Sequence, residues 1–521
     1  MNDSDNNEET LRKSEEILSE DDNLNPKYKK GTSTFLGAFL QIGNTILGAG
    51  IISLPVVFRY LGFILGFVFI TIIAILTIYS SYLLLRAHQI TNKKKYLTIA
   101  HASMGDKGYI FTNIMIILNN FGLCCVYFRV VADTLQNIIG AYVSKDNFLV
   151  KNWHNFLYIL IILVIMSFVI WTKDFKKFEK TSFLGMIGII IYFFIIIALF
   201  IYKVSNGFKP YYSLNSYFVS GEFTNILICL PSVFLSFSFQ FNLFPIYSGL
   251  INRTHSQMLK ITQFSIIFCF ILYIFSGIFG FLLYGDNLND TILNEFLTEI
   301  QDEKSDLTIK ILLIISNVGF LLCAITSIPL IYYTLKQNFF STYKFILKIK
   351  KKKNIEMENE DENNKITNEK SLEINNGENI DTNSEITNNT ESETEIETER
   401  TNSESSENNK DKKKIRINLT KKEEIIISVI LYITIGCITI LKKKKKSMFN
   451  IVGSTAANSI QFIIPCLMII CLKEKSEKLI NLILVKILLI FGIVSLIICL
   501  VAEFVNAFIY SERHKKHDVH L

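Results

Sequence analysis

Residues 41–55 place three glycines, an asparagine and a proline inside the first strongly apolar run of the chain, residues 33–57. Glycine and proline disfavour a helix interior by about 1 and 3 kcal/mol relative to alanine. At membrane depth they are tolerated where the backbone leaves the helix and lines a cavity. An unwound segment offers N–H groups from one half-helix and C=O groups from the other, which suits a carboxylate and a cation. The alternative is a packing seam of small residues between helices, for which Gly48 and Gly50 would serve.

A second apolar run, residues 223–247, is interrupted in a similar way. Pro231 and Pro245 stand on either side of a Ser-Phe-Ser-Phe segment at 236–239. The serines would satisfy freed backbone groups and the phenylalanines would wall a pocket. Ordinary proline kinks are the alternative, since these are common in membrane helices. Two interrupted spans, five helices apart, are typical of an inverted-repeat transporter.

Two further groups carry chemistry in apolar runs. Cys323, Thr326 and Ser327 fall on neighbouring parts of one helix face. Their hydroxyls, together with backbone carbonyls, are hard oxygen ligands for a small cation, and hydrogen bonding between helices is the alternative. Arg129 and Asp133 lie one helical turn apart, which predicts an ion pair or a gate inside the membrane, with a proton relay as the alternative.

The composition identifies the class of protein. Half of the 521 residues are hydrophobic, and most of the charged residues lie outside the apolar runs. This pattern indicates a multi-pass membrane protein, with the lipid bilayer as a partner. The net charge of +6 comes from lysines at the ends of the runs, so nucleic acid is not an expected partner. The cysteines form no CxxC pair, and no nucleophile–base pair falls in the spans, so we expect no cofactor and no enzyme activity.

Eleven apolar runs predict an all-α fold in which spans one to five and six to ten form two inverted halves, with an eleventh helix appended. The polar segments 1–30 and 350–420 read as a disordered cytosolic tail and a disordered cytosolic insert. We therefore expect spans one to eight within 31–349, spans nine to eleven within 421–511, and a short tail at 512–521. The runs are 33–57, 61–86, 108–141, 154–172, 181–203, 223–247, 259–284, 307–334, 423–441, 448–472 and 480–510.

The lysine distribution predicts a cytosolic N-terminus. One loop disagrees, because the five lysines at 442–446 fall outside in this orientation. An Asn-Asp-Thr glycosylation acceptor at Asn289 lies in a predicted outer loop, in agreement with it. Both the plasma membrane and a vacuolar or lysosomal membrane fit these features. The sequence sets no expectation for the oligomeric state.

Several motifs, in order, resemble the amino acid/auxin permease family and in particular its sodium-coupled neutral amino acid transporter branch. They are the N-x-I-x-G-x-G-I-I-x-L-P run at 44–55, Ser-Tyr-Leu-Leu-Leu at 81–85, Phe-Pro-Ile-Tyr at 244–247, and the Gly-Ser-Thr-Ala-Ala-Asn run at 453–458 that continues to Pro465. The resemblance implies a leucine-transporter-like fold that works by alternating access. It also implies an amino acid bound between the first and sixth helices, and a sodium ion between the first and eighth.

The resemblance places both sites on particular residues. The expected substrate-binding residues are Asn44, Thr45, Leu47, Gly48, Ala49, Gly50, Ser236, Phe237, Ser238 and Phe239. The expected sodium ligands are the carbonyls of Gly43 and Ile46, with Cys323, Thr326 and Ser327. One departure concerns coupling. The branch tends to have Cys-His-Pro after the sixth-helix break, where this chain has Phe-Gln-Phe at 239–241, so sodium and proton both stay open as coupling ions.

The sequence thus predicts a secondary active transporter of amino acids. The phenylalanines at 237 and 239 favour neutral or aromatic substrates. Two alternatives come from other classes. One is a nutrient sensor that binds an amino acid with little transport, and the other is an ion channel or a structural scaffold.

Overall fold

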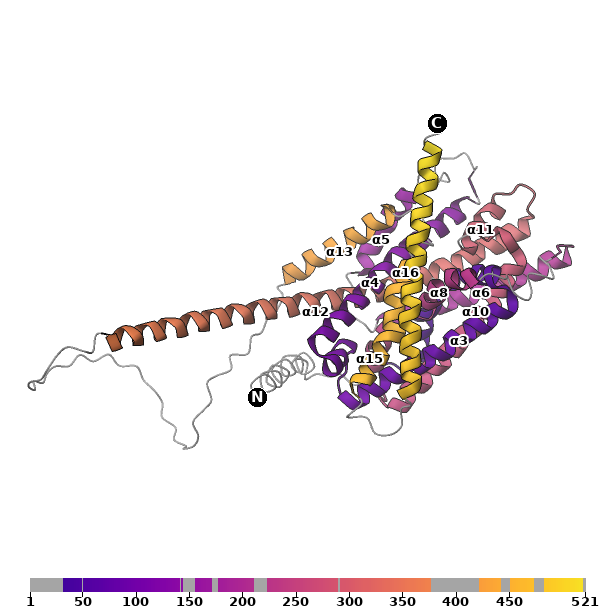
Figure 1. The fold of residues 1–521 in the computed structure, drawn as a ribbon. Coiled ribbons are helices and arrows are strands. Elements are labelled where there is room, and N and C mark those ends of the chain that lie inside the picture. The colour runs from indigo at the N-terminus through magenta and orange to yellow at the C-terminus, as the bar shows by residue number, and fades with distance from the viewer. Residues whose placement is uncertain are drawn as a thin grey trace, which may run out of the picture. The chain divides into compact units, whose positions relative to one another are not determined.

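A computed structural model describes residues 31–48, 50–140, 142–143, 155–170, 177–209, 223–288, 291–375, 421–441, 450–472 and 482–518. Within these ranges every regular element is a helix (Figure 1). The one pairing of extended segments there is an isolated bridge between Ser33 and Leu250. The predicted all-α architecture is confirmed.

The first apolar run forms two helices separated by a break. The side chain of Thr34 caps α2 (Phe35–Leu47) by accepting a hydrogen bond from the Gly37 N–H at 3.1 Å. The next helix, α3 (Leu54–Thr91), begins with Pro55 in its first turn, where a missing N–H costs nothing. A non-helical residue, Gly62 with φ 74°, then divides α3. The first part of α3 therefore completes span one, and the remainder is span two.

The sixth run is also broken. It forms α8 (Phe223–Ser236) and α9 (Gln240–Gly249), so the gap falls on residues 237–239. Pro231 and Pro245 lie inside the two helices, one on each side of the gap. The sequence predicted an irregular segment between these prolines, and residues 237–239 within it are irregular.

Nine helices in the described part of the chain are long and apolar enough to cross a membrane. Adding α5 and the span formed by α2 with the start of α3 accounts for the eleven predicted spans. The other helices are α4 (Tyr96–Gly140), α5 (Asn155–Ile170), α6 (Lys177–Ser205), α10 (His255–Tyr284), α11 (Ile292–Ile300), α12 (Leu307–Asn375), α13 (Lys421–Leu441), α15 (Ile464–Cys471) and α16 (Leu482–Asp518), with a 3₁₀ turn η2 (Gly285–Asn287) and two π-helical segments, η3 (Gly453–Ala457) and η4 (Ser459–Ile463).

The helices that surround the first break are α3, α6 and α10. α10 packs along both α2 and α3, and α2 also packs against α6. In Figure 1 the indigo α3 runs beside α10, in agreement with these contacts. Glycines allow the closest approaches between helices. A Cβ added to Gly277 of α10 would lie 2.4 Å from the Phe58 ring.

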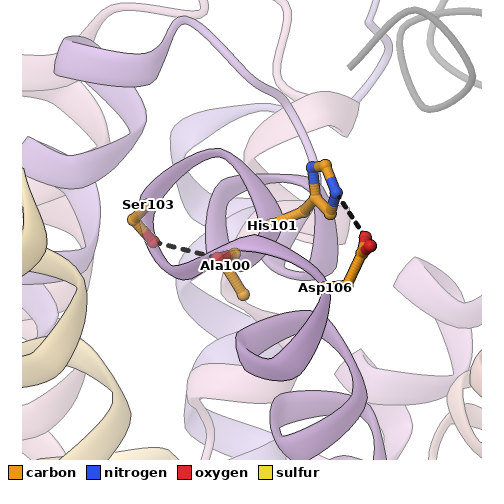
Figure 2. A network of polar contacts seen from close by, with 4 residues as sticks. All are labelled: Ala100, His101, Ser103 and Asp106. Atoms are coloured by element: carbon orange, nitrogen blue, oxygen red, sulfur yellow. Dashed lines mark hydrogen bonds and ion pairs between the residues drawn. The ribbon is translucent and has the colours of Figure 1, made fainter. Parts of the chain in front are cut away.

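A kink at Gly105, with φ 68° and ψ −162°, separates the start of α4 from its membrane span. Across this kink the buried His101 ring contacts the exposed Asp106 carboxylate, with Nε2 and Oδ1 2.9 Å apart (Figure 2). The Ser103 hydroxyl donates to the Ala100 carbonyl at 3.1 Å. The His101–Asp106 contact therefore links the short entry helix to the membrane span across the kink.

Two helices extend beyond the predicted boundaries. α12 continues to Asn375, whereas we expected disorder from residue 350 onward. The physical reason is that residues 350–375 contain no proline or glycine, and opposite charges recur four residues apart, as in Lys352–Glu356 and Asp361–Lys365. Residues 340–425 form a unit separate from the rest of the chain. α16 similarly runs to Asp518, past the boundary at 511. The predicted disorder of 1–30 and 376–420 lies outside the described residues.

Candidate functional site

The two broken helices touch at their gaps. A Cβ added to Gly50 would lie 2.6 Å from the Ser236 hydroxyl oxygen and 2.8 Å from the Ser236 Cα, so only glycine allows this approach. Inside the first gap, the Ser53 N–H and hydroxyl both donate to the Gly50 carbonyl, at 3.1 and 2.8 Å. The gap is therefore a compact turn packed directly on α8.

A tyrosine from α4 lies against the first gap. A Cβ added to Gly48 would lie 1.4 Å from the hydroxyl oxygen of the buried Tyr127. Sequence reasoning missed this residue, because a tyrosine inside an apolar run is unremarkable. The available signal was its hydroxyl, which must find a polar partner at membrane depth.

A second tyrosine connects the two breaks. The hydroxyl of Tyr273 on α10 lies 2.5 Å from the Ile46 carbonyl and 2.8 Å from the Ser236 carbonyl. The Tyr273 and Phe237 rings pack edge to face, with their centroids 5.3 Å apart. The carbonyl ends of α2 and α8 therefore converge on one point, which the sequence analysis did not identify.

The second gap buries both predicted phenylalanines, Phe237 and Phe239. The Phe239 N–H donates to the Gln240 side chain at 3.0 Å. The serines differ from the expectation, because the Ser236 hydroxyl donates to Ser232 of its own helix at 2.7 Å. The buried Ser238 hydroxyl has no hydrogen-bond partner among the described residues. The second gap thus buries one hydroxyl that no described group satisfies.

Two of the predicted α12 residues, Cys323 and Thr326, lie near the side chain of Asn44. The Cys323 Sγ lies 3.6 Å from Asn44 Oδ1. A Cβ on Gly185 of α6 would come within 2.5 Å of Asn44 Oδ1 and 2.3 Å of Thr326 Oγ1. The Asn44 amide nitrogen is buried without a hydrogen-bond partner in the described part of the chain. α2, α6 and α12 therefore bring a small set of polar atoms together.

The predicted sodium ligands have other partners in this structure. The Thr326 hydroxyl donates to the Leu322 and Cys323 carbonyls, at 2.9 and 3.0 Å, and the Ser327 hydroxyl donates to the Cys323 carbonyl at 2.8 Å. The predicted carbonyl ligands on α2 face α10. Gly43 accepts from the Cys269 thiol at 3.8 Å, and Ile46 accepts from Tyr273. The sodium site stays a prediction.

Next to Asn44 on α2, a second set of polar contacts joins α2 to α9 and α12. The amide of buried Asn242 donates to Thr45 Oγ1 at 3.5 Å and accepts from Thr334 Oγ1 at 2.9 Å. Sequence reasoning included Thr45 but missed the other two residues. The Ser33 N–H also donates to the Gly249 carbonyl at 2.9 Å, which ties the start of α2 to the end of α9.

The remaining predicted residues lie apart from these contacts or outside the description. Arg129 and Asp133 form an ion pair of 3.5 Å within α4, with side chains 11% and 10% exposed. A gating role for this pair stays a prediction. Leu47 is buried at the end of α2, and Ala49 lies outside the described residues.

Comparison with known proteins places this fold among transporters. The profile of the family described as "Transmembrane amino acid transporter protein" matches residues 31–508. The chain resembles MhsT, known from a crystal structure in complex with L-phenylalanine, with a TM-score of 0.56, 11% identity, and coverage of 91% of this chain and 100% of that one. The predicted leucine-transporter-like fold is confirmed.

Similar sequences occur in plants and fish. Amino acid transporter AVT6E of Arabidopsis thaliana is 24% identical over 309 residues, which are 58% of this chain and 62% of that protein. Sodium-coupled neutral amino acid symporter 2 of Danio rerio is 22% identical over 294 residues, which are 52% of this chain and 57% of that protein. The alignments thus cover about three fifths of the length of each relative. Because the family profile extends over nearly all the described helices, the chain belongs to the transmembrane amino acid transporter protein family.

Proposed function

We propose that this protein is a secondary active transporter of amino acids, with the substrate held between the two broken helices and transport driven by a cation, sodium or proton. The observation that carries the proposal is the contact between two helix gaps that leave converging carbonyls and the unpartnered, buried Ser238 hydroxyl. Membership of an amino acid transporter family supports it.

The negative carboxylate and the positive ammonium group of an amino acid match the opposite partial charges at helix N-termini and C-termini. The carboxylate is placed in the first gap, around Gly48 and Gly50. This gap leads to the N-terminus of α3 at Leu54, which carries the positive end of that helix's dipole. The Tyr127 hydroxyl, which lies against Gly48, is a further donor for it. The ammonium group is placed at the carbonyl ends of α2 and α8, represented by Ile46 and Ser236.

The substrate side chain is placed against Phe237 and Phe239, which line the second gap. An apolar wall favours neutral and aromatic amino acids, because a charged side chain would lose its hydration there without a partner. The MhsT structure contains L-phenylalanine, and the fish relative is described as a neutral amino acid symporter, in keeping with this preference. We place the protein in the plasma membrane or a vacuolar-type membrane, with the N-terminus in the cytosol.

The coupling cation is placed at the polar cluster around Asn44. The Asn44 side-chain oxygen and the Thr326 and Ser327 hydroxyls are hard ligands, and all belong to helices that meet near Gly185. A sodium ion bound by these ligands would link α2 to α12. An inward movement of α2 would then release the ion together with the substrate.

Amino acid uptake into proteoliposomes under imposed sodium or proton gradients tests the proposal. Thr326→Ala is compared with Thr262→Ala, since the Thr262 hydroxyl is also buried and donates to its own helix, at 2.9 Å to Met258. We expect saturable sodium-driven uptake that Thr326→Ala reduces at least about tenfold, because one ligand of the ion is lost, and that Thr262→Ala preserves.

The other outcomes separate the alternatives. Proton-driven uptake that survives Thr326→Ala would make this threonine a helix-packing residue and remove the sodium site. Amino acid binding without saturable uptake would identify a nutrient sensor instead of a carrier. If the protein neither bound nor transported any common amino acid, the proposal would be refuted.

A further inference from the structure

The junction of the two breaks has one proton donor for two acceptors. The Tyr273 hydroxyl is within hydrogen-bond distance of the Ile46 and Ser236 carbonyls, at 2.5 and 2.8 Å, but it carries a single proton. All three groups are buried. Whichever carbonyl receives this proton, the other lies close to the same oxygen without a hydrogen between them.

Both carbonyls also belong to helix C-termini. Ile46 lies in the last turn of α2, and Ser236 is the final residue of α8. Each helix end carries a partial negative charge equivalent to roughly half an elementary charge. Two such ends directed at one point, in a region without bulk water, are the arrangement that a bound cation ordinarily stabilises. Here the point is occupied by a side chain of the protein itself.

Tyr273 is the last of three donors that α10 directs at α2. Ser265, Cys269 and Tyr273 follow one another at intervals of four residues, so they share one face of the helix. They contact carbonyls of α2 that lie about one turn apart. Cys269 donates to Gly43 at 3.8 Å and Tyr273 to Ile46, whereas the Ser265 hydroxyl is 3.4 Å from the Phe39 carbonyl and 2.8 Å from the Ile261 carbonyl of its own helix. Only Tyr273 in this series also reaches the other broken helix.

We propose that Tyr273 is a positioning residue whose hydroxyl takes the place of a cation at the junction of the two broken helices. Its proton holds the carbonyl ends of α2 and α8 at the spacing that receives the substrate's ammonium group, and the carbonyl left without a proton accepts from that group. It follows that transport requires no cation at this junction and that any driving cation binds elsewhere. The substrate part of the inference rests on the proposed amino acid transport.

The test uses Tyr273→Phe, which removes the donor but fills the space, and Tyr273→Ser, which also vacates the junction. The matched controls are Tyr332→Phe and Tyr332→Ser. Tyr332 is equally buried and donates to a backbone carbonyl, Ser428 on α13, at 2.6 Å, away from both breaks. A merely structural role for Tyr273 predicts that the two tyrosines respond alike.

The first measurement is the melting temperature of the purified full-length proteins without amino acid, as sodium chloride replaces choline chloride at constant ionic strength. We expect Tyr273→Ser to gain a sodium-dependent rise in melting temperature, because the ion enters the vacated junction. Wild type and Tyr332→Ser should share a smaller dependence, or none. Equal sodium dependence in all three proteins would overturn the replacement of a cation by Tyr273.

The second measurement is the KM and maximal rate of amino acid uptake in proteoliposomes. We expect Tyr273→Phe to raise KM about tenfold with a smaller change in maximal rate, and Tyr332→Phe to leave KM within about twofold of wild type. An unchanged KM in Tyr273→Phe would overturn the positioning role. Absence of uptake by wild type would refute the proposed function alone, and the melting measurement would still decide the inference.

Discussion

Glycines and hydroxyl groups make the closest contacts at the two breaks. Gly50 lets the first gap touch Ser236, and Gly48 leaves space for the Tyr127 hydroxyl. Neither glycine has the positive φ that ordinarily demands this residue. Their role is therefore the space that a side chain would fill. For this reason, even a substitution by alanine at these positions should alter transport, because the added methyl group displaces a neighbouring side chain.

At the residue scale, Gly48→Ala tests this role of empty space. The added methyl group would lie 1.4 Å from the Tyr127 hydroxyl oxygen, so the ring must move away from the break. We expect uptake to fall at least about tenfold, with a loss of stability of roughly 1–3 kcal/mol from overpacking. Uptake kinetics and melting temperature measure the two effects.

Gly249→Ala is the control, because a Cβ there has no other atom within 4 Å. It should leave both quantities near the wild-type values. If Gly48→Ala behaved like this control, Tyr127 would have no part in the substrate site.

At the element scale, the broken helices are held on both sides of their gaps. Asn242 of α9 connects Thr45 of α2 with Thr334 of α12. On the other side, the Ile292 N–H at the start of α11 donates to the Ile52 carbonyl in the first gap at 3.2 Å. The first broken helix is therefore held by two separate sets of contacts, and the proposed alternating access would require one set to open at a time.

The Asn242 bridge should govern the opening of α2 away from α9. In Asn242→Ala, the Thr45 and Thr334 hydroxyls lose this partner, and we expect a loss of stability of about 1–3 kcal/mol. Labelling of a cysteine introduced at Gln41, one turn before Thr45 on α2, should become faster from the predicted cytosolic side. The labelling rate and the melting temperature are the measurements.

Thr334→Val and the double variant complete the comparison. If the bridge acts as a unit, the double variant is less destabilised than the sum of the two single variants. Additive losses, with an unchanged labelling rate at residue 41, would show that Asn242 does not hold the helices together.

At the scale of the whole molecule, the count of spans determines where the termini lie. The described helices account for the eleven predicted spans, and an odd number of spans would place the two ends of the chain on opposite sides of the membrane. The distribution of lysines predicts a cytosolic N-terminus. In that orientation the five lysines at 442–446, which fall outside the described residues, are predicted on the outer side, against the general trend.

Epitope tags before Met1 and after Leu521 test this arrangement. In intact cells or sealed vesicles, antibody should reach the C-terminal tag and a tag inserted at 442–446 from the non-cytosolic side. The N-terminal tag should require permeabilisation. Finding both termini on the same side would mean that one predicted span does not cross the membrane.

The sequence by itself predicted the helices and where they break, because these follow from local chemistry. Glycines and the proline in residues 41–55, and the prolines flanking residues 236–239, disfavour continuous helices wherever the chain folds. The same reasoning placed eleven apolar runs of spanning length. The predicted end of α12 was wrong, because we gave the polarity of residues 350–375 more weight than their lack of helix-breaking residues.

Only the tertiary structure decided which side chains meet at the breaks. Tyr273 reaches a carbonyl 227 residues away along the chain, and Asn242 contacts a threonine 197 residues away. Neither stands out in its own segment, since a tyrosine or asparagine in an apolar run only signals that some partner exists. The partner depends on which helices pack together and in what register. Those are properties of the whole bundle, which local propensity and hydrophobic pattern do not specify.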